Sequence, residues 1–148
     1  MNFSKQGFLR AKPRKVNKIL VVLPIPTLYN LLYMKSTTHT HPWGSSIELT
    51  KNQPSTVKIL VVNPGEEFSL QYHKNREEFW HVLSGTPTII IGNEEFTARE
   101  GDEFIVKKND KHRISAKDTE VRILEISLGG FNEDDIVRIE DKYGRVNQ

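Results

Sequence analysis

The sequence contains no cysteine among its 148 residues. Disulfide bridges, thiolate metal ligands and a cysteine nucleophile are therefore excluded. A large charge imbalance is also missing, because the formal net charge is +2 and acidic and basic residues alternate from residue 50 onward. This balance predicts no basic face for a nucleic acid, so no nucleic-acid partner is expected. At this length we expect one domain that is large enough to bury a core.

An apolar run long enough to cross a membrane is absent as well. The run at residues 19–33 is shorter than the roughly 20 apolar residues of a spanning helix, and it contains Pro24 and Pro26. It follows a basic segment but lacks the cleavage site of a signal peptide. Three interpretations of residues 1–33 stay open: an upstream extension of a protein that starts at Met34, a poorly ordered arm or extra edge strand, and a targeting segment. We expect no membrane partner.

After residue 50 the sequence alternates short β-branched or aromatic runs with turn signals. Asn63-Pro64-Gly65 and Gly92-Asn93 predict two of the turns. The predicted strands span residues 57–62, 68–73, 79–83, 88–91, 96–97, 103–106, 112–115 and 121–128. Many short strands at even spacing, without helical periodicity, indicate an all-β sandwich or barrel.

Candidate metal ligands gather around one predicted strand. Side chains alternate between faces, so Gln71 and His73 share one face while the apolar side chains around them share the other. Glu78 lies on the next strand, and His112 begins a later one, from which each can close the site. This set of two imidazoles, one carboxylate and one amide suits a single divalent ion, zinc first, with manganese, iron, cobalt and nickel as alternatives. The weaker candidates are His39, His41 and His81.

Residues 65–85, GEEFSLQYHKNREEFWHVLSG, resemble the first sequence motif of the cupins. Gln71 stands where most cupins have the first histidine of that motif. The resemblance implies an all-β fold with a single cupin (jelly-roll) β-barrel. We expect this domain to span residues 41–148, after a loosely structured N-terminal arm or upstream extension at residues 1–40.

The second cupin motif is partly present. Gly101 and His112 occupy its glycine and histidine positions, but Lys107 and Asn109 stand where proline and glycine are usual. Because asparagine tolerates left-handed backbone geometry, the turn before His112 can still form. His112 therefore remains a predicted ligand.

Two further segments, HPWGSSIEL from His41 and NEDDIVRIEDKYGR at residues 132–145, narrow the resemblance. With the first motif they resemble the C-terminal cupin domain of type II mannose-6-phosphate isomerases, which is often fused to a mannose-1-phosphate guanylyltransferase. The match includes no guanylyltransferase domain, so nucleotide-sugar synthesis is not expected of this chain, and His41 replaces the family's usual arginine. The resemblance implies a cytoplasmic enzyme of polysaccharide biosynthesis. It would convert mannose 6-phosphate to fructose 6-phosphate through a cis-enediol(ate) stabilised by the metal.

That reaction needs positive charge near the enediolate and cations for the phosphate. The resemblance implies that the tail approaches the barrel mouth, and we predict Arg138 as a catalytic residue. A solvated surface strap is the alternative role for this tail. The predicted substrate-binding residues are Lys58, Arg76, Tyr143 and Arg145. Arg76 could equally brace Glu77 or Glu78, and the sequence does not single out a catalytic base.

Two other functions stay open, a non-catalytic sugar- or sugar-phosphate-binding cupin and an iron-dependent oxygenase. The Gln71 ligand and the IVRIEDKYGR tail argue against the oxygenase. The expected partner is a small sugar phosphate. We also expect a homodimer, because cupins often pair through sheet edges, which need covering.

Overall fold

The computed structural model describes residues 36–146, and its regular structure is almost entirely β. The strands are β1 (Thr37–His41), β2 (Gly44–Glu48), β3 (Ser55–Val62), β4 (Leu70–His73), β5 (Glu77–Ser84), β6 (Thr88–Ile91), β7 (Glu94–Thr97), β8 (Glu103–Val106), β9 (His112–Ser115), β10 (Val121–Leu128) and β11 (Ile136–Glu140). One 3₁₀ turn, η2 (Glu133–Asp135), precedes β11. Within the described range no helix is long and apolar enough to cross a membrane.

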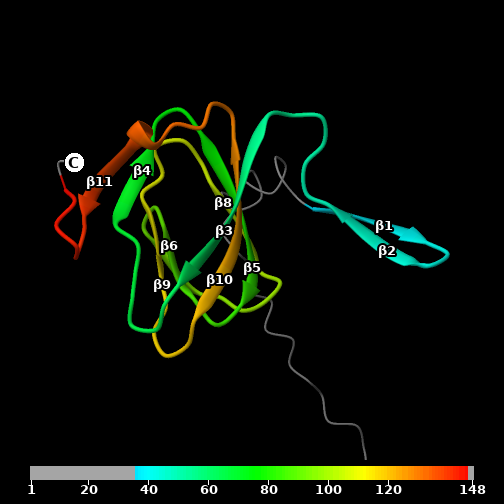
Figure 1. Cartoon of the computed structure of the whole chain (residues 1–148), viewed down its shortest axis with the longest axis horizontal. Coiled ribbons are helices and arrows are strands. Elements are labelled where there is room, and N and C mark those ends of the chain that lie inside the picture. The colour runs from blue at the N-terminus through cyan, green and yellow to red at the C-terminus, as the bar shows by residue number, and fades with distance from the viewer. Residues whose placement is uncertain (1–35, 147–148) are drawn as a thin grey trace, which may run out of the picture. The chain divides into compact units, whose positions relative to one another are not determined.

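Two antiparallel sheets build the barrel (Figure 1). One has the strand order β3-β10-β5-β8 and the other β11-β4-β9-β6-β7. The eight-residue strand β10 pairs along its whole length with β3 and along most of it with β5. These pairings confirm the predicted all-β fold.

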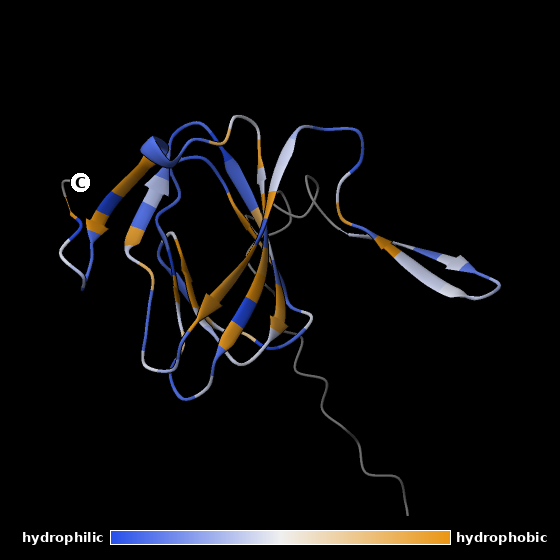
Figure 2. Ribbon diagram, in the orientation of Figure 1, coloured by the Kyte–Doolittle hydropathy of each residue, from blue (hydrophilic) through white to orange (hydrophobic). Residues whose placement is uncertain are grey.

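The core lies between the two sheets. Val82 and Ile123 from one sheet pack in the same cluster as Ile89 and Ile114 from the other, and all four are fully buried. Hydrophobic residues, which are orange in Figure 2, are more frequent in the barrel strands than in the loops that join them. Side chains two residues apart share a face, so the strands that carry Ile123 and Ile114 can also bring polar side chains into the interior.

The last residues of the predicted arm, 37–40, are described by the structure. Residues 37–40 belong to β1, which forms a separate two-stranded sheet with β2. Pro42 and Trp43 make the turn, and the alternating threonines of β1 suit an extended backbone because threonine is β-branched. Residues 1–35, which hold the rest of the predicted arm and the apolar run, lie outside the described range.

Strand β3 is at one edge of its sheet as the described residues define it. Its outward side chains Val57, Ile59 and Val61 are each about half exposed or more, at 59%, 54% and 49%. An edge strand has unpaired backbone groups, and the exposed apolar side chains of β3 would favour association with a strand of another chain. The homodimer remains a prediction.

Candidate metal centre

Three of the four predicted ligands meet in the barrel interior. His73, Glu78 and His112 are almost completely buried, and each offers one ligand atom within 4.8 Å of the others. His73 Nε2 lies 3.1 Å from one Glu78 oxygen, and His112 Nε2 lies 3.9 Å from the other. Their meeting follows from the topology, because His73 ends β4, Glu78 is the second residue of β5 after a short turn, and His112 begins β9 beside β4.

The turn before β9 prepares His112 as a ligand. Asn109 has left-handed geometry (φ 67°), as predicted, and its amide donates to the His73 carbonyl at 2.7 Å. His112 Nδ1 lies 2.8 Å from the Asp110 carbonyl, which can only accept, so Nδ1 carries the hydrogen. The buried Nε2 is then an acceptor with no hydrogen-bond partner in the described structure. Such a buried, oriented imidazole lone pair fits a metal ion.

Arg76 holds the carboxylate of the group in place. It is buried, and its Nε donates to Glu78 Oε1 at 2.9 Å while Nη1 donates to the Asn132 carbonyl at 3.0 Å. Its Nη2 also lies 3.0 Å from His73 Nε2. Of the two roles considered for Arg76, the structure displays the bracing of Glu78. A role in substrate binding stays a prediction.

Asp135 fixes the turn that separates His73 from Glu78. Its carboxylate accepts hydrogen bonds from the backbone amides of Lys74 and Asn75 and from the Asn75 side chain. Burial alone would raise the pKa of Asp135, but these amide donors lower it below its usual value. The ligand-bearing turn is therefore tied to the segment that precedes β11.

The surroundings of Glu78 and His112 favour the protonation states in which these side chains can bind a metal ion. Burial would raise the pKa of Glu78, but the His73 hydrogen bond, the charges nearby and the Arg76 hydrogen bond lower it to about 2. Burial lowers the pKa of His112 to about 4, against the opposing effect of the Glu78 charge. At neutral pH Glu78 is therefore ionised and His112 neutral, which are the forms that bind metals.

Gln71, the fourth predicted ligand, lies in a row across the five-stranded sheet. It is opposite His112 on one side and opposite Arg138 of β11 on the other, so the three side chains share one face. Its Oε1 accepts a hydrogen bond from buried Ser69 at 2.7 Å. Residues 136–140 of the tail thus pair with β4 as strand β11 of this sheet. Metal ligation by Gln71 and catalysis by Arg138 stay predictions.

Lys58 lies on the interior-facing side of β3, in register with Glu125 of β10. Its Nζ pairs with Glu133 at 3.0 Å and sits 3.9 Å from the centre of the Phe131 ring. Arg76 contacts the same ring at 4.9 Å. The aromatic ring therefore lies against two of the predicted substrate-binding cations.

Tyr143 and Arg145 do not join the metal group. Strand β11 runs antiparallel to β4, so it starts opposite His73 and ends opposite Leu70. The tail beyond Glu140 consequently continues away from the end of β4 that holds the ligand.

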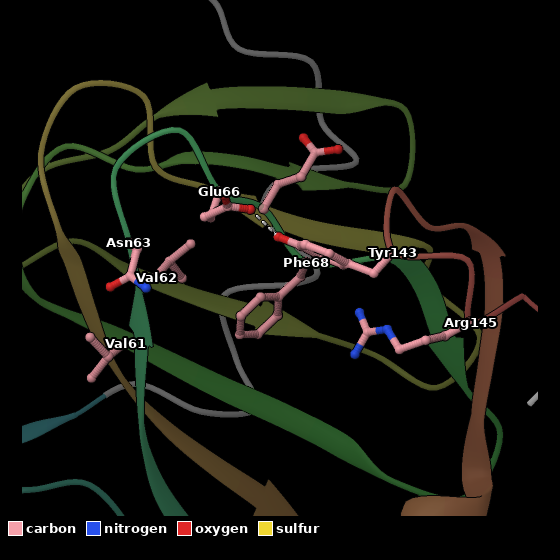
Figure 3. Close-up of a pocket in the computed structure, with 8 residues that line it drawn as sticks. Val61, Val62, Asn63, Glu66, Phe68, Tyr143 and Arg145 are labelled. Carbon is pink, nitrogen blue, oxygen red and sulfur yellow. Dashed lines mark hydrogen bonds between the residues drawn. The ribbon is translucent and has the colours of Figure 1, made fainter.

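Tyr143 and Arg145 instead line a separate surface pocket of about 360 Å³ together with Phe68 (Figure 3). The Tyr143 hydroxyl donates to Glu66, and the Arg145 guanidinium forms a two-point ion pair with Asp141, the shorter contact being 2.7 Å. Both polar groups already have carboxylate partners, and their predicted role in substrate binding stays a prediction.

The remaining histidines lie outside the metal group. His39 and His41 are on the β1–β2 hairpin, where His41 stacks on Trp43 with ring centres 4.6 Å apart. His81 pairs with Glu103 at 3.2 Å on the sheet face opposite to Glu78. Strand alternation predicted that position for His81.

Sequence reasoning did not single out the buried carboxylate of Glu125 on β10. It is 6% exposed and accepts a hydrogen bond from Ser127 at 2.9 Å. Burial, and then the charge of Glu78, raise its pKa above the usual value. The run VRILEISL contains a signal, because its acidic residue stands on the same face as Val121 and Ile123.

Solved structures with the same fold include two at low sequence identity. The capsular polysaccharide assembling protein CapF of Staphylococcus aureus matches with a TM-score of 0.55 at 15% identity, over 72% of this chain and 35% of that chain. A Klebsiella pneumoniae protein with a double-stranded β-helix domain matches with a TM-score of 0.53 at 20% identity, over 63% and 81%. With its two-sheet barrel, this chain has the cupin fold.

The chain belongs to the mannose-6-phosphate isomerase C-terminal family, whose sequence profile matches residues 30–141. The xanthan biosynthesis protein XanB of Xanthomonas campestris is 36% identical over 107 residues, which are 71% of this chain and 23% of that protein. A mannose-1-phosphate guanylyltransferase of Klebsiella pneumoniae is 32% identical over 106 residues, 70% of this chain and 22% of that protein. The chain thus spans less than a quarter of the length of these relatives.

Proposed function

We propose that this protein is a cytoplasmic, metal-dependent aldose–ketose isomerase that interconverts mannose 6-phosphate and fructose 6-phosphate. Membership of the isomerase C-terminal family supports the choice of reaction. The observation that carries the proposal is the row of Arg138, Gln71 and His112 across one sheet face. This row puts a permanent positive charge on the same face as two predicted metal ligands.

The donor set fits a divalent ion, with zinc as the first choice. His73, Glu78 and His112 are held within reach of one another, and the buried His112 Nε2 has no hydrogen-bond partner in the described structure. Gln71 would add an amide oxygen as a neutral fourth ligand. When bound, the ion would supply Lewis-acid stabilisation of negative charge on a substrate oxygen.

The chain's own residues would orient the sugar phosphate. Arg138 would hold a developing oxyanion, because its guanidinium stays charged and offers two parallel donors. Lys58 is a candidate for the phosphate, since its partner Glu133 is an exposed carboxylate that a phosphate dianion can replace. Arg76 would keep the Glu78 carboxylate in a fixed position throughout.

The test follows ketose formation from mannose 6-phosphate with protein loaded with Zn²⁺, Mn²⁺, Co²⁺ or Ni²⁺. Arg138→Ala should leave the metal content unchanged and lower turnover by about 10²-fold or more, the scale for loss of one oxyanion donor. Arg138→Lys should recover part of it, because lysine restores the charge without the two-pronged geometry. Arg122→Ala is the matched control, because Arg122 is exposed on β10.

Two results would change the assignment. If the wild type isomerises nothing with any of these ions but binds hexose phosphates, the protein is a non-catalytic sugar-phosphate-binding cupin. If Arg138→Ala turns over as fast as the wild type, the Arg138 role is wrong and the charge must come from another cation.

A further inference from the structure

Glu125 is a buried acid in the barrel interior, and none of the roles described above involves it. On β10 it shares a face with Ser127, and its neighbours in register are Lys58 on β3 and Trp80 on β5. Ser127 is itself in register with Glu78. Glu125 and Glu78 are therefore diagonal neighbours on one sheet face, a position in which Cα atoms are about 7–8 Å apart.

The other two buried carboxylates of the described range, Glu78 and Asp135, already have structural roles. Glu78 accepts hydrogen bonds from Arg76 and Trp80 and belongs to the metal group. Asp135 accepts from the backbone of the turn that carries Arg76. Glu125 accepts from the small hydroxyl of Ser127 and contacts none of the metal group in any hydrogen bond or ion pair of the described structure. A buried carboxylate in an interior shared with a metal group is a candidate for proton transfer.

We propose that Glu125 is the general base that moves the proton between C1 and C2 of the sugar, an inference that rests on the proposed isomerase function. In the open-chain aldose its carboxylate accepts the C2 proton. The C–H electron pair becomes the C1–C2 double bond, and the carbonyl π pair moves to O1. The resulting carboxylic acid returns the proton to C1 as the O2 proton passes to O1. C2 is then the carbonyl carbon of the ketose.

The surroundings of Glu125 suit this task. Burial raises its pKa, and a carboxylate with a raised pKa is a stronger base when ionised. Lys58 in register beside it supplies a compensating positive charge for the ionised form. Trp80 on its other side gives the acid an apolar neighbour that keeps water away from the proton.

The experiment compares metal-loaded wild type with Glu125→Gln, which keeps the shape and removes the base, and Glu125→Asp, which keeps the charge and shortens the reach. Glu103→Gln is the matched control, because Glu103 lies on the opposite face of the same sheet and pairs with His81. Two quantities are measured with mannose 6-phosphate: ketose formation, and deuterium uptake at the C1 and C2 positions in D₂O.

Glu125→Gln should lose turnover by about 10²-fold or more, the range for removing a general base, with metal content and KM close to those of the wild type. Deuterium uptake should fall in parallel, and Glu125→Asp should retain part of both. A purely structural role predicts lost metal or a raised KM and leaves exchange per bound substrate intact, which would overturn the proposal. Exchange by Glu125→Gln at the wild-type rate would overturn the Glu125 assignment alone. An inactive wild type would overturn the isomerase function and this assignment together.

Discussion

In the metal-free protein, His112 should make the free energy of unfolding depend on pH. Its imidazole ordinarily titrates near 6.5, but burial lowers its pKa in the folded chain to about 4. As the pH falls through 6.5, His112 becomes protonated in the unfolded chain but stays neutral in the folded chain. Stability is therefore complete above pH 6.5 and falls until about pH 4. The difference, at about 1.4 kcal/mol per pH unit, amounts to about 3 kcal/mol.

Urea unfolding at a series of pH values, followed by tryptophan fluorescence after chelator treatment, measures this loss. Glu78 contributes in a lower range, because its pKa of about 2 means that its stabilisation is lost only below about pH 4.5. In the window from 6.5 to 4.5 the raised pKa of Glu125 acts with the opposite sign, so the histidine is isolated by comparing the wild type with a His112 variant that keeps Glu125. His112→Gln should flatten the slope in this window, and the NMR titration of His112 should give a midpoint near 4. Parallel slopes in the two proteins, or a midpoint near 6.5, would refute the reasoning.

Two further outcomes are expected. His73→Ala should leave the purified protein with little bound metal by elemental analysis, whereas His81→Ala, on the opposite sheet face, should keep the wild-type content; equal contents would remove His73 from the site. Gly85→Ala should destabilise the fold by several kcal/mol in urea unfolding, because its φ is +84° and the added Cβ would lie 2.5 Å from the Glu120 carbonyl oxygen. Gly92→Ala, with φ +63° and nothing within 4 Å of the added Cβ, should cost about 1–2 kcal/mol, and equal losses would contradict the steric argument.

Strand alternation predicted most of the barrel strands, and alternation together with the short turn after His73 predicted its grouping with Glu78. The reason is that a period of two fixes which side chains share a face as soon as the strand is recognised. The same rule placed His81 on the other face, and the known tolerance of asparagine for left-handed geometry predicted the Asn109 turn. Local rules work here because each of these features is decided within a few residues.

Long-range pairing explains what the sequence could not provide. Ile136–Glu140 became a strand because β4 offers it an edge, and this edge is more than 60 residues away in the chain. Glu125 was overlooked because both faces of β10 carry apolar residues, so alternation shows that Glu125 shares a face with Ile123 but does not show which face is the interior. Tyr143 was assigned to the substrate, yet its carboxylate partner Glu66, 77 residues away in the chain, becomes visible only once the tail is placed.

The hydrogen bonds that the Asp135 carboxylate accepts from the turn after His73 have a consequence for the synthesis of the protein. All four predicted ligands have left the ribosome once residue 112 has emerged. The Asp135 carboxylate, which fixes the turn between His73 and Glu78, emerges later, because it lies 60 residues after its partner Asn75. Until that carboxylate emerges, His73 and Glu78 are joined by a turn that lacks three of its hydrogen bonds. A well-ordered ligand group can therefore form only late in synthesis, so the nascent chain should become able to bind a metal only after η2 and β11 have joined the barrel.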